Sequence, residues 1–188
     1  MKLYHGSGTG GKGILHRSEC QKIFCEKGVI VVGQIKVNFL GVGAYSQVLR
    51  IFYQLHKTHS DLRPDFYLPS DTPLTREWYE TILENPENSV LGAMDGERLV
   101  GICFLMWTDR KNPLCVPRKV AHIDYVCVDE ESRGQGIGEM LCREAIRVAQ
   151  EKKAVSVELS VWNDNRPAVS LYQKVGFKPR TLNLELIF

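Results

Sequence analysis

The chain has 188 residues, a length that suits one ordinary domain and leaves little room for a two-domain enzyme. Its 24 Lys and Arg residues against 22 Asp and Glu residues give a formal net charge of +2, which is too balanced to predict nucleic-acid binding. No apolar run approaches the ~20 residues that a membrane-spanning helix needs, so we expect no membrane partner.

The six cysteines indicate a reducing environment rather than a disulfide framework. Cys103, Cys127 and Cys142 lie inside apolar runs, and no signal-peptide pattern precedes them. His16, Cys20 and Cys25 lack a matching Cys or His pair that would complete four ligands for zinc. We therefore expect a cytoplasmic protein without a metal site.

The first 27 residues differ in composition from the rest and form the first predicted unit. Glycines crowd this stretch, and residues 6–13 nearly match a phosphate-binding P-loop. Gly13, however, replaces the Ser or Thr that would hold magnesium. We predict a Gly-rich N-terminal appendage over 1–27 and one domain over 28–188.

The first half of this domain alternates apolar strands with amphipathic helices. A β-branched run over 29–39 predicts a strand broken at Gly33, and apolar residues at helical spacing over 45–55 predict a helix. A short helix is expected over 76–83 among several prolines. Apolar runs on both sides of Asp95-Gly96 predict an antiparallel hairpin.

The second half repeats a strand–helix pattern. We expect a strand over 120–128, a glycine-rich turn, a helix over 137–149, an alternating strand over 155–161 and a short helix that begins near Pro167. Alternating leucines over 181–188 predict a last strand. The order β-α-α-β-β-β-α-β-α-β argues an α/β (α+β) fold, with a mixed central sheet of about six to seven strands flanked by helices.

Residues 133–138, Arg-Gly-Gln-Gly-Ile-Gly, lie where a strand passes into a helix. Backbone N–H groups at a helix start can point together at an anion, and glycines let a phosphate approach the main chain closely. A dinucleotide-binding G-x-G-x-x-G motif would need glycine where Glu139 stands. We therefore predict a cradle for the pyrophosphate of a ligand other than a dinucleotide.

Three spaced motifs resemble one known family. They are Arg133-x-x-Gly136-x-Gly138, Asn165-x-x-Ala168 and Leu171-Tyr172-x-x-x-Gly176-Phe177. In this order and context they are similar to the coenzyme-A-binding and following blocks of the Gcn5-related N-acetyltransferase (GNAT) superfamily. The resemblance is strong over 120–177 and extends back to about residue 35.

The resemblance implies acetyl-CoA as cofactor and direct attack of an amine on its thioester, without a covalent enzyme intermediate. It also implies a V-shaped gap between the strands over 120–128 and 154–162, where the pantetheine arm would pair with main-chain groups. The residues implied to bind the cofactor are Cys127, Val128, Arg133, Gly134, Gln135, Gly136, Ile137, Gly138 and Asn165. Asn165 is equally well explained as a helix cap.

Three residues are candidate catalytic groups. Tyr172 matches the family's usual general acid, although it could instead be an aromatic residue packed on the core. Asp124 or His122 could accept the ammonium proton, directly or through water, or could be polar residues at a strand's edge. Period-two spacing predicts that His122, Asp124 and Val128 share one strand face, with Tyr125 and Cys127 on the other.

The function predicted from the sequence is N-acetyl transfer from acetyl-CoA to a primary amine of a small molecule or a protein. The alternative is a catalytically silent module that binds acyl-CoA and regulates another process. The residues that choose the acceptor lie on variable loops, so its identity stays open. A monomer and a homodimer are equally compatible with the sequence.

Overall fold

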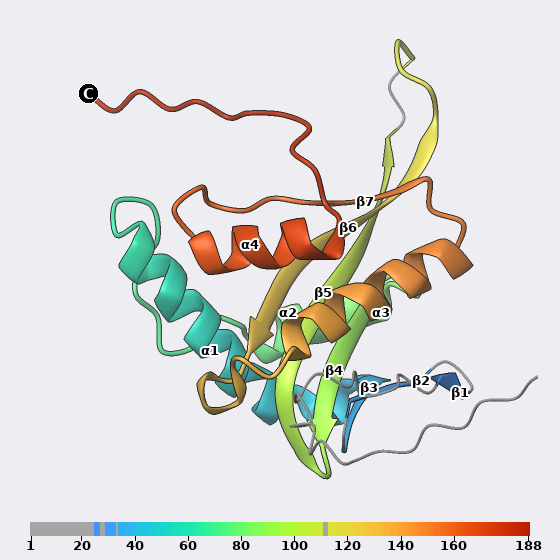
Figure 1. Cartoon of the computed structure of the whole chain (residues 1–188). Helices are drawn as coiled ribbons and strands as arrows, with labels where there is room; N and C mark the ends of the chain where they lie inside the picture. Colours follow the sequence, from blue (N-terminus) through green and yellow to red (C-terminus); the bar gives the residue numbers. More distant parts are fainter. Residues whose placement is uncertain (1–24, 27–28, 33, 111–112) are drawn as a thin grey trace, which may run out of the picture.

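The computed structural model describes residues 25–26, 29–32, 34–110 and 113–188. Most of the predicted N-terminal appendage, including the P-loop-like stretch at 6–13 and the residues His16 and Cys20, lies outside the described residues. The described chain forms one mixed sheet that is flanked by helices (Figure 1). No helix in these ranges is long and apolar enough to cross a membrane.

Five strands make up the body of the sheet and follow one another in space as they do in sequence. They are β3 (Ile35–Phe39), β4 (Ser89–Asp95), β5 (Arg98–Arg110), β6 (Arg118–Val128) and β7 (Ser156–Leu159). All neighbours pair antiparallel except β6 and β7, which run parallel. Two short strands, β1 (Cys25–Glu26) and β2 (Val29–Val32), extend the β3 edge.

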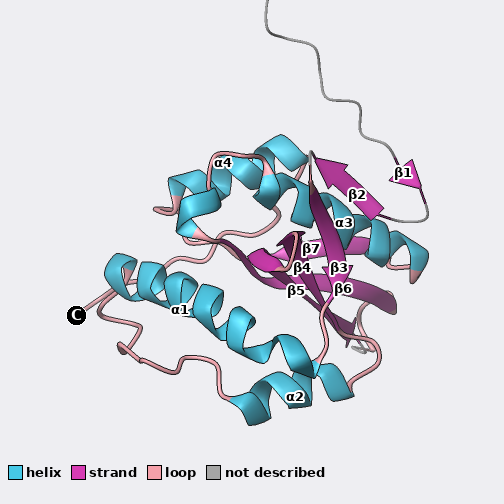
Figure 2. Ribbon diagram, turned by 90° about the horizontal axis from the view of Figure 1, so that it is seen from below, coloured by secondary structure: helices cyan, strands magenta, loops and turns pink. Residues whose placement is uncertain are grey.

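Helices cover both faces of the sheet (Figure 2). On one face lie α1 (Tyr45–Leu62) and α2 (Arg76–Glu84), and on the other lie α3 (Ile137–Glu151) and α4 (Arg166–Val175). Short 3-10 turns at Val42–Ala44 and Glu130–Ser132 precede α1 and α3. Each face has its own buried cluster, one centred on Ile51 and Phe104 beneath α1, the other on Leu105 and Leu141 beneath α3.

Local sequence chemistry sets several of these boundaries. The hairpin predicted at Asp95-Gly96 is confirmed, with Gly96 at φ +58°, a conformation that glycine adopts without strain. The Thr75 hydroxyl accepts a hydrogen bond from the Trp78 N–H and begins α2. Gly176 at φ +111° ends α4.

The body of the sheet has five strands where six to seven were predicted, the short β1 and β2 only extending its edge, and the predicted order of elements is not matched. The run over 29–39 is two antiparallel strands, because the chain turns between Val32 and Ile35 where the sequence pattern indicated only a break. The predicted last strand over 181–188 is absent. This stretch pairs with no strand in the described structure, and Leu182, Leu184 and Leu186 are 76–87% exposed, because alternation supplies a strand-like face but no hydrogen-bonding partner.

Gly92 in β4 offers a test of the packing beneath α1. A Cβ added there would lie 2.7 Å from side-chain carbons of Leu40 and Leu99, so both side chains would have to move. We expect Gly92→Ala to lower the free energy of unfolding by about 1–3 kcal/mol, as overpacking does. Gly43→Ala is the control, since nothing lies within 4 Å of its added Cβ. Equal urea midpoints for the two variants would contradict this packing.

Candidate active site

The parallel pairing of β6 and β7 stops partway along β6. The ladder joins Val120 to Ser156 and ends at Ile123 and Leu159. Beyond that point β6 continues to Val128, whereas β7 has ended. The two strands therefore part at Asp124, which agrees with the gap that the family resemblance implied.

An irregularity in β6 lies at this same point. The register with β5 shifts between Phe104, which pairs with Tyr125, and Leu105, which pairs with Ile123. Asp124 is therefore left without a pairing residue on β5. Such a bulge inserts one extra residue into one strand and disrupts its alternation. Asp124 is therefore the extra residue.

The bulge decides which main-chain groups of β6 face the side that β7 has left. Lys119 C=O accepts from Val155 N–H on the β7 side, whereas Asp129 N–H donates to Val100 C=O on the β5 side. In a regular strand, residues 119 and 129, both odd-numbered, would turn their main-chain groups to the same side. They turn them to opposite sides, so the alternation has reversed between the two residues. Val126 and Val128 consequently turn their N–H and C=O groups to the open side. Of these groups, Val128 C=O accepts a hydrogen bond from Arg133 Nε at 3.2 Å.

The same reversal overturns the predicted arrangement of side chains on β6. Ile123 and Val128 both pack in the cluster beneath α3, while Tyr125 and Cys127 pack in the cluster beneath α1. Strict period two, which placed His122, Asp124 and Val128 on one face, is therefore wrong across the bulge. His122 lies between residues that face α3 and so shares the α1 face with Tyr125 and Cys127.

The glycine-rich turn is open toward solvent at the start of α3. Gly134 and Gly136 have φ +78° and +81°, and nothing lies within 4 Å of a Cβ added to either. No side chain caps the helix, whose first N–H groups have no intrahelical acceptor. Gly138 differs, because its added Cβ would meet Leu171 of α4 at 3.1 Å. The turn is thus a cradle of backbone donors, with α4 packed closely behind it.

His122 and Asp124 are brought together. His122 Nδ1 and Asp124 Oδ1 lie 2.5 Å apart, and the two side chains are 31% and 36% exposed. This bond leaves His122 Nε2 as the ring nitrogen that can exchange a proton with another group. Among the described residues, no group of three or more His, Cys, Asp or Glu side chains could hold a metal ion.

Tyr172 lies on α4, and its ring packs edge-on against Phe177 at 5.9 Å between centroids. Burial raises the pKa of its phenol well above the ordinary value, helped by the nearby Cys142 thiol. In the described structure its hydroxyl shares no hydrogen bond with His122 or Asp124. Asn165 caps α4, with its Oδ1 accepting from Ala168 N–H at 3.3 Å, so the capping interpretation is confirmed.

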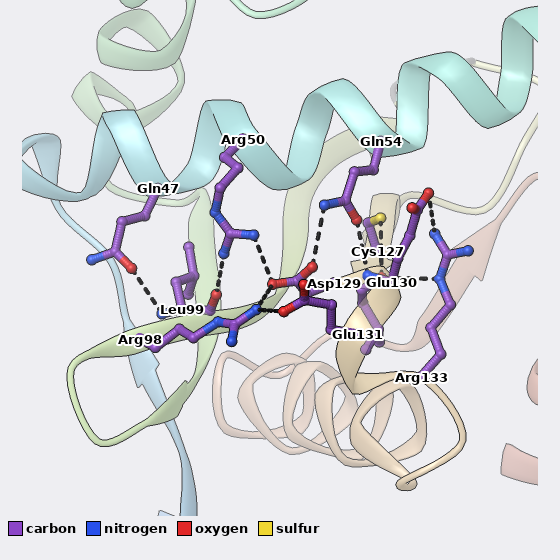
Figure 3. Close-up of polar contacts among 11 residues, drawn as sticks. Gln47, Arg50, Gln54, Arg98, Leu99, Cys127, Asp129, Glu130, Glu131 and Arg133 are labelled. Carbon is purple, nitrogen blue, oxygen red and sulfur yellow. Dashed lines mark hydrogen bonds and ion pairs between the residues drawn. The ribbon is translucent and has the colours of Figure 1, made fainter.

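A polar network that the sequence analysis did not identify joins α1 to Asp129 and Glu130, which begin the turn after β6 (Figure 3). The Asp129 carboxylate, only 2% exposed, accepts from Arg50 at 2.7 Å, from Arg98 at 3.0 Å and from Gln54 at 3.2 Å. Gln54 also accepts from the Glu130 N–H at 3.0 Å. The spacing of Gln47, Arg50 and Gln54 along one helical face was the only sequence clue to these contacts.

Comparisons with known proteins agree with this geometry. The family described as "Acetyltransferase (GNAT) family" matches residues 53–177. An L-amino acid N-acetyltransferase of Escherichia coli (strain K12) is 29% identical over 109 residues, which cover 56% of this chain and 63% of that protein. The N-alpha-acetyltransferase RimI of Mycobacterium tuberculosis (strain ATCC 25618 / H37Rv) is 32% identical over 108 residues, covering 57% and 63%. The chain thus spans less than two thirds of these relatives' length.

Solved structures extend the likeness to the fold. A tetramutant of the BH1408 protein from Bacillus halodurans superposes with a TM-score of 0.77 at 23% identity, covering 81% of this chain and 99% of that one. An aminoglycoside acetyltransferase from an uncultured soil sample superposes with a TM-score of 0.64 at 17% identity, covering 82% and 95%. Both identities are low, so these neighbours establish the fold alone.

Asp129 provides a pH-dependent test of the network. Burial alone would raise the pKa of its carboxyl, but hydrogen bonds from Arg50, Gln54 and Arg98 outweigh burial and hold the pKa at about 2, against an ordinary 3.8. Because the pKa is lower in the folded state than in the unfolded state, the ionised carboxylate stabilises the fold above pH ~4. This contribution of about 2 kcal/mol to the free energy of unfolding is lost as the pH falls toward 2.

We therefore expect Asp129→Asn to lower the free energy of unfolding by about 2 kcal/mol at pH 7, with a difference from wild type that shrinks between pH 4 and 2. Urea unfolding at several pH values measures it. Glu131→Gln is the control, because Glu131 also pairs with Arg98 but is 74% exposed, and exposed pairs contribute little. Equal losses in both variants at pH 7 would contradict the account.

Proposed function

Because the chain belongs to the GNAT acetyltransferase family, we propose that it transfers an acetyl group from acetyl-CoA to a primary amine of a small molecule or a protein. One observation carries the proposal: the open side of β6 leads directly to the uncapped start of α3. Relatives named as acetyltransferases of amino acids and mycothiol support the same reaction type.

The residues of the glycine-rich turn fit coenzyme A. Gly134 and Gly136 leave free the space that a Cβ would fill, and the N–H groups over 134–138 are suited to a pyrophosphate. Arg133 lies beside them and is 50% exposed at its side chain. Main-chain groups of Val126 and Val128 are suited to an extended, amide-bearing arm. When bound there, acetyl-CoA supplies an acetyl thioester.

The His122–Asp124 pair is suited to remove a proton from the acceptor. An amine attacks a carbonyl only as the neutral base, so the ammonium proton must leave first. Asp124 holds His122 Nδ1 at 2.5 Å and stabilises the imidazolium that forms when Nε2 takes that proton. Both side chains are partly exposed, so an acceptor can reach them.

Tyr172 is the proposed donor of a proton to the departing thiolate. A tyrosine phenol is protonated at neutral pH and so carries a proton that it can donate. Direct transfer is favoured over an acyl-enzyme on Cys127, because burial raises the pKa of that thiol to about 11 and keeps it un-ionised. The chain therefore positions two reactants and moves two protons.

The cofactor proposal is tested at Gly136. Asp and Asn have nearly the same shape and both tolerate positive φ, so Gly136→Asp and Gly136→Asn differ mainly in charge. We expect the Asp variant to bind coenzyme A at least about tenfold more weakly than the Asn variant, because its carboxylate repels the pyrophosphate. Isothermal titration calorimetry measures both. Equal affinities in two folded variants would place the phosphates elsewhere.

The role of Tyr172 is tested by Tyr172→Phe, which keeps the ring and removes the proton. Turnover should fall about 100-fold to 10,000-fold, with the affinity for coenzyme A maintained. Tyr53→Phe on α1, a residue that is 40% exposed, controls for the loss of a tyrosine hydroxyl. An unchanged kcat, with chemistry shown to limit the rate, would remove Tyr172 from the mechanism.

A further inference from the structure

Three aromatic side chains gather beside the point where β6 and β7 part, and we call them the aromatic wall: Phe66, Tyr67 and Trp162. Trp162 Nε1 donates to the Tyr67 hydroxyl at 3.3 Å. The Phe66 ring lies 5.0 Å from Tyr67 and 5.4 Å from Trp162, between centroids. Two segments far apart in sequence therefore build one surface.

The aromatic wall is anchored by contacts with the end of α1. Phe66 N–H and Tyr67 N–H both donate to Arg63 C=O in a turn at the end of α1. Tyr67 stacks on His59 at 5.3 Å, and the Arg63 guanidinium lies 4.4 Å from the Trp162 ring centroid. A surface ordered before binding loses little conformational entropy when a ligand contacts it.

The wall flanks the His122–Asp124 pair. Asp124 is the first β6 residue beyond the last β6–β7 pair, and Trp162 follows the end of β7 beyond the same pair. Burial raises the pKa of the Tyr125 phenol, and the neighbouring Asp124 and Tyr67 raise it further, so both lie close to this ring. An acceptor that presents its amine to Asp124 and His122 would thus have its neighbouring group against the aromatic wall.

The wall also exposes apolar surface. Phe66 is 61% exposed, and its neighbour Leu68 is 84% exposed. An exposed apolar patch at the mouth of a site commonly marks a surface that binds an apolar group. Burying an aromatic ring against it would strengthen the binding of an acceptor that carries such a ring.

Charge around the wall disfavours a polycation. Arg63 pairs with both Asp65 and Glu185, and Glu158 of β7 pairs with Arg118 and Arg180. Asp124 differs from these carboxylates in that its partner is His122, at the point where the amine would react. One carboxylate at that point suits one ammonium, whereas polyamines and aminoglycosides carry several.

We infer that the acceptor is a singly charged amine with an apolar or aromatic group beside it, as in the α-amine of a hydrophobic amino acid or peptide, and that the aromatic wall selects it. This inference rests on the proposed acetyl transfer. Phe66 acts as a specificity residue, contacting the group next to the amine rather than the reacting atoms.

The test compares L-phenylalanine amide with glycine amide, which present the same kind of amine with and without a ring, and with spermidine. We expect kcat/KM for the phenylalanine amide to exceed that for glycine amide about tenfold or more, and spermidine to be the poorest acceptor. In Phe66→Ala the ratio between the two amides should fall about tenfold, and Phe66→Tyr should restore it.

The matched control is Phe39→Ala on β3, since Phe39 is 60% exposed and lies toward the opposite edge of the sheet. It should leave the ratio unchanged. A wild-type enzyme that acetylates both amides equally, prefers spermidine, or keeps its preference in Phe66→Ala would overturn the inference while leaving acetyl transfer intact. Absence of turnover with every amine would instead overturn the proposed function, and this inference with it.

Discussion

The single extra residue in β6, Asp124, is the constraint on which the rest of the site depends. It reverses the alternation of the strand, so that the main-chain N–H and C=O groups of Val126 and Val128 face the side that β7 has left. It also sends the side chains of Tyr125 and Cys127 into the cluster beneath α1. Without it, the main chain leading to the glycine-rich turn would present its hydrogen-bonding groups to the wrong neighbours.

The second requirement is that the turn after β6 stays in place relative to α1. Asp129 achieves this with hydrogen bonds from Arg50 and Gln54 on α1 and from Arg98 at the start of β5. The last turn of α1 leads into the aromatic wall at Phe66 and Tyr67. One helix therefore contacts both the proposed cofactor turn and the proposed acceptor surface, which fixes the distance between two substrates that must react with each other.

Local chemistry was predictable from the sequence, and long-range pairing was not. The hairpin at Asp95-Gly96, the helix cap at Asn165 and the glycine-rich turn follow from residue types at fixed spacing. The sequence gives no local signal for the bulge at Asp124. The alternation of residue types was read with a strict period of two, and the irregularity is visible only in the pairing of β6 with β5. The predicted strand over 181–188 failed since a strand needs a partner, and the Asp129 network joins residues 75 and 79 positions apart.

The proposed function requires this chain to catalyse acetyl transfer rather than only to hold the cofactor. The most direct measurement is the release of free thiol from acetyl-CoA in the presence and absence of L-phenylalanine amide, with mass spectrometry of the amine. We expect thiol release that depends on the amine and matches the acetylated product one to one. Binding of acetyl-CoA with no amine-dependent release, across the acceptor panel, would contradict it and indicate a silent acyl-CoA-binding module.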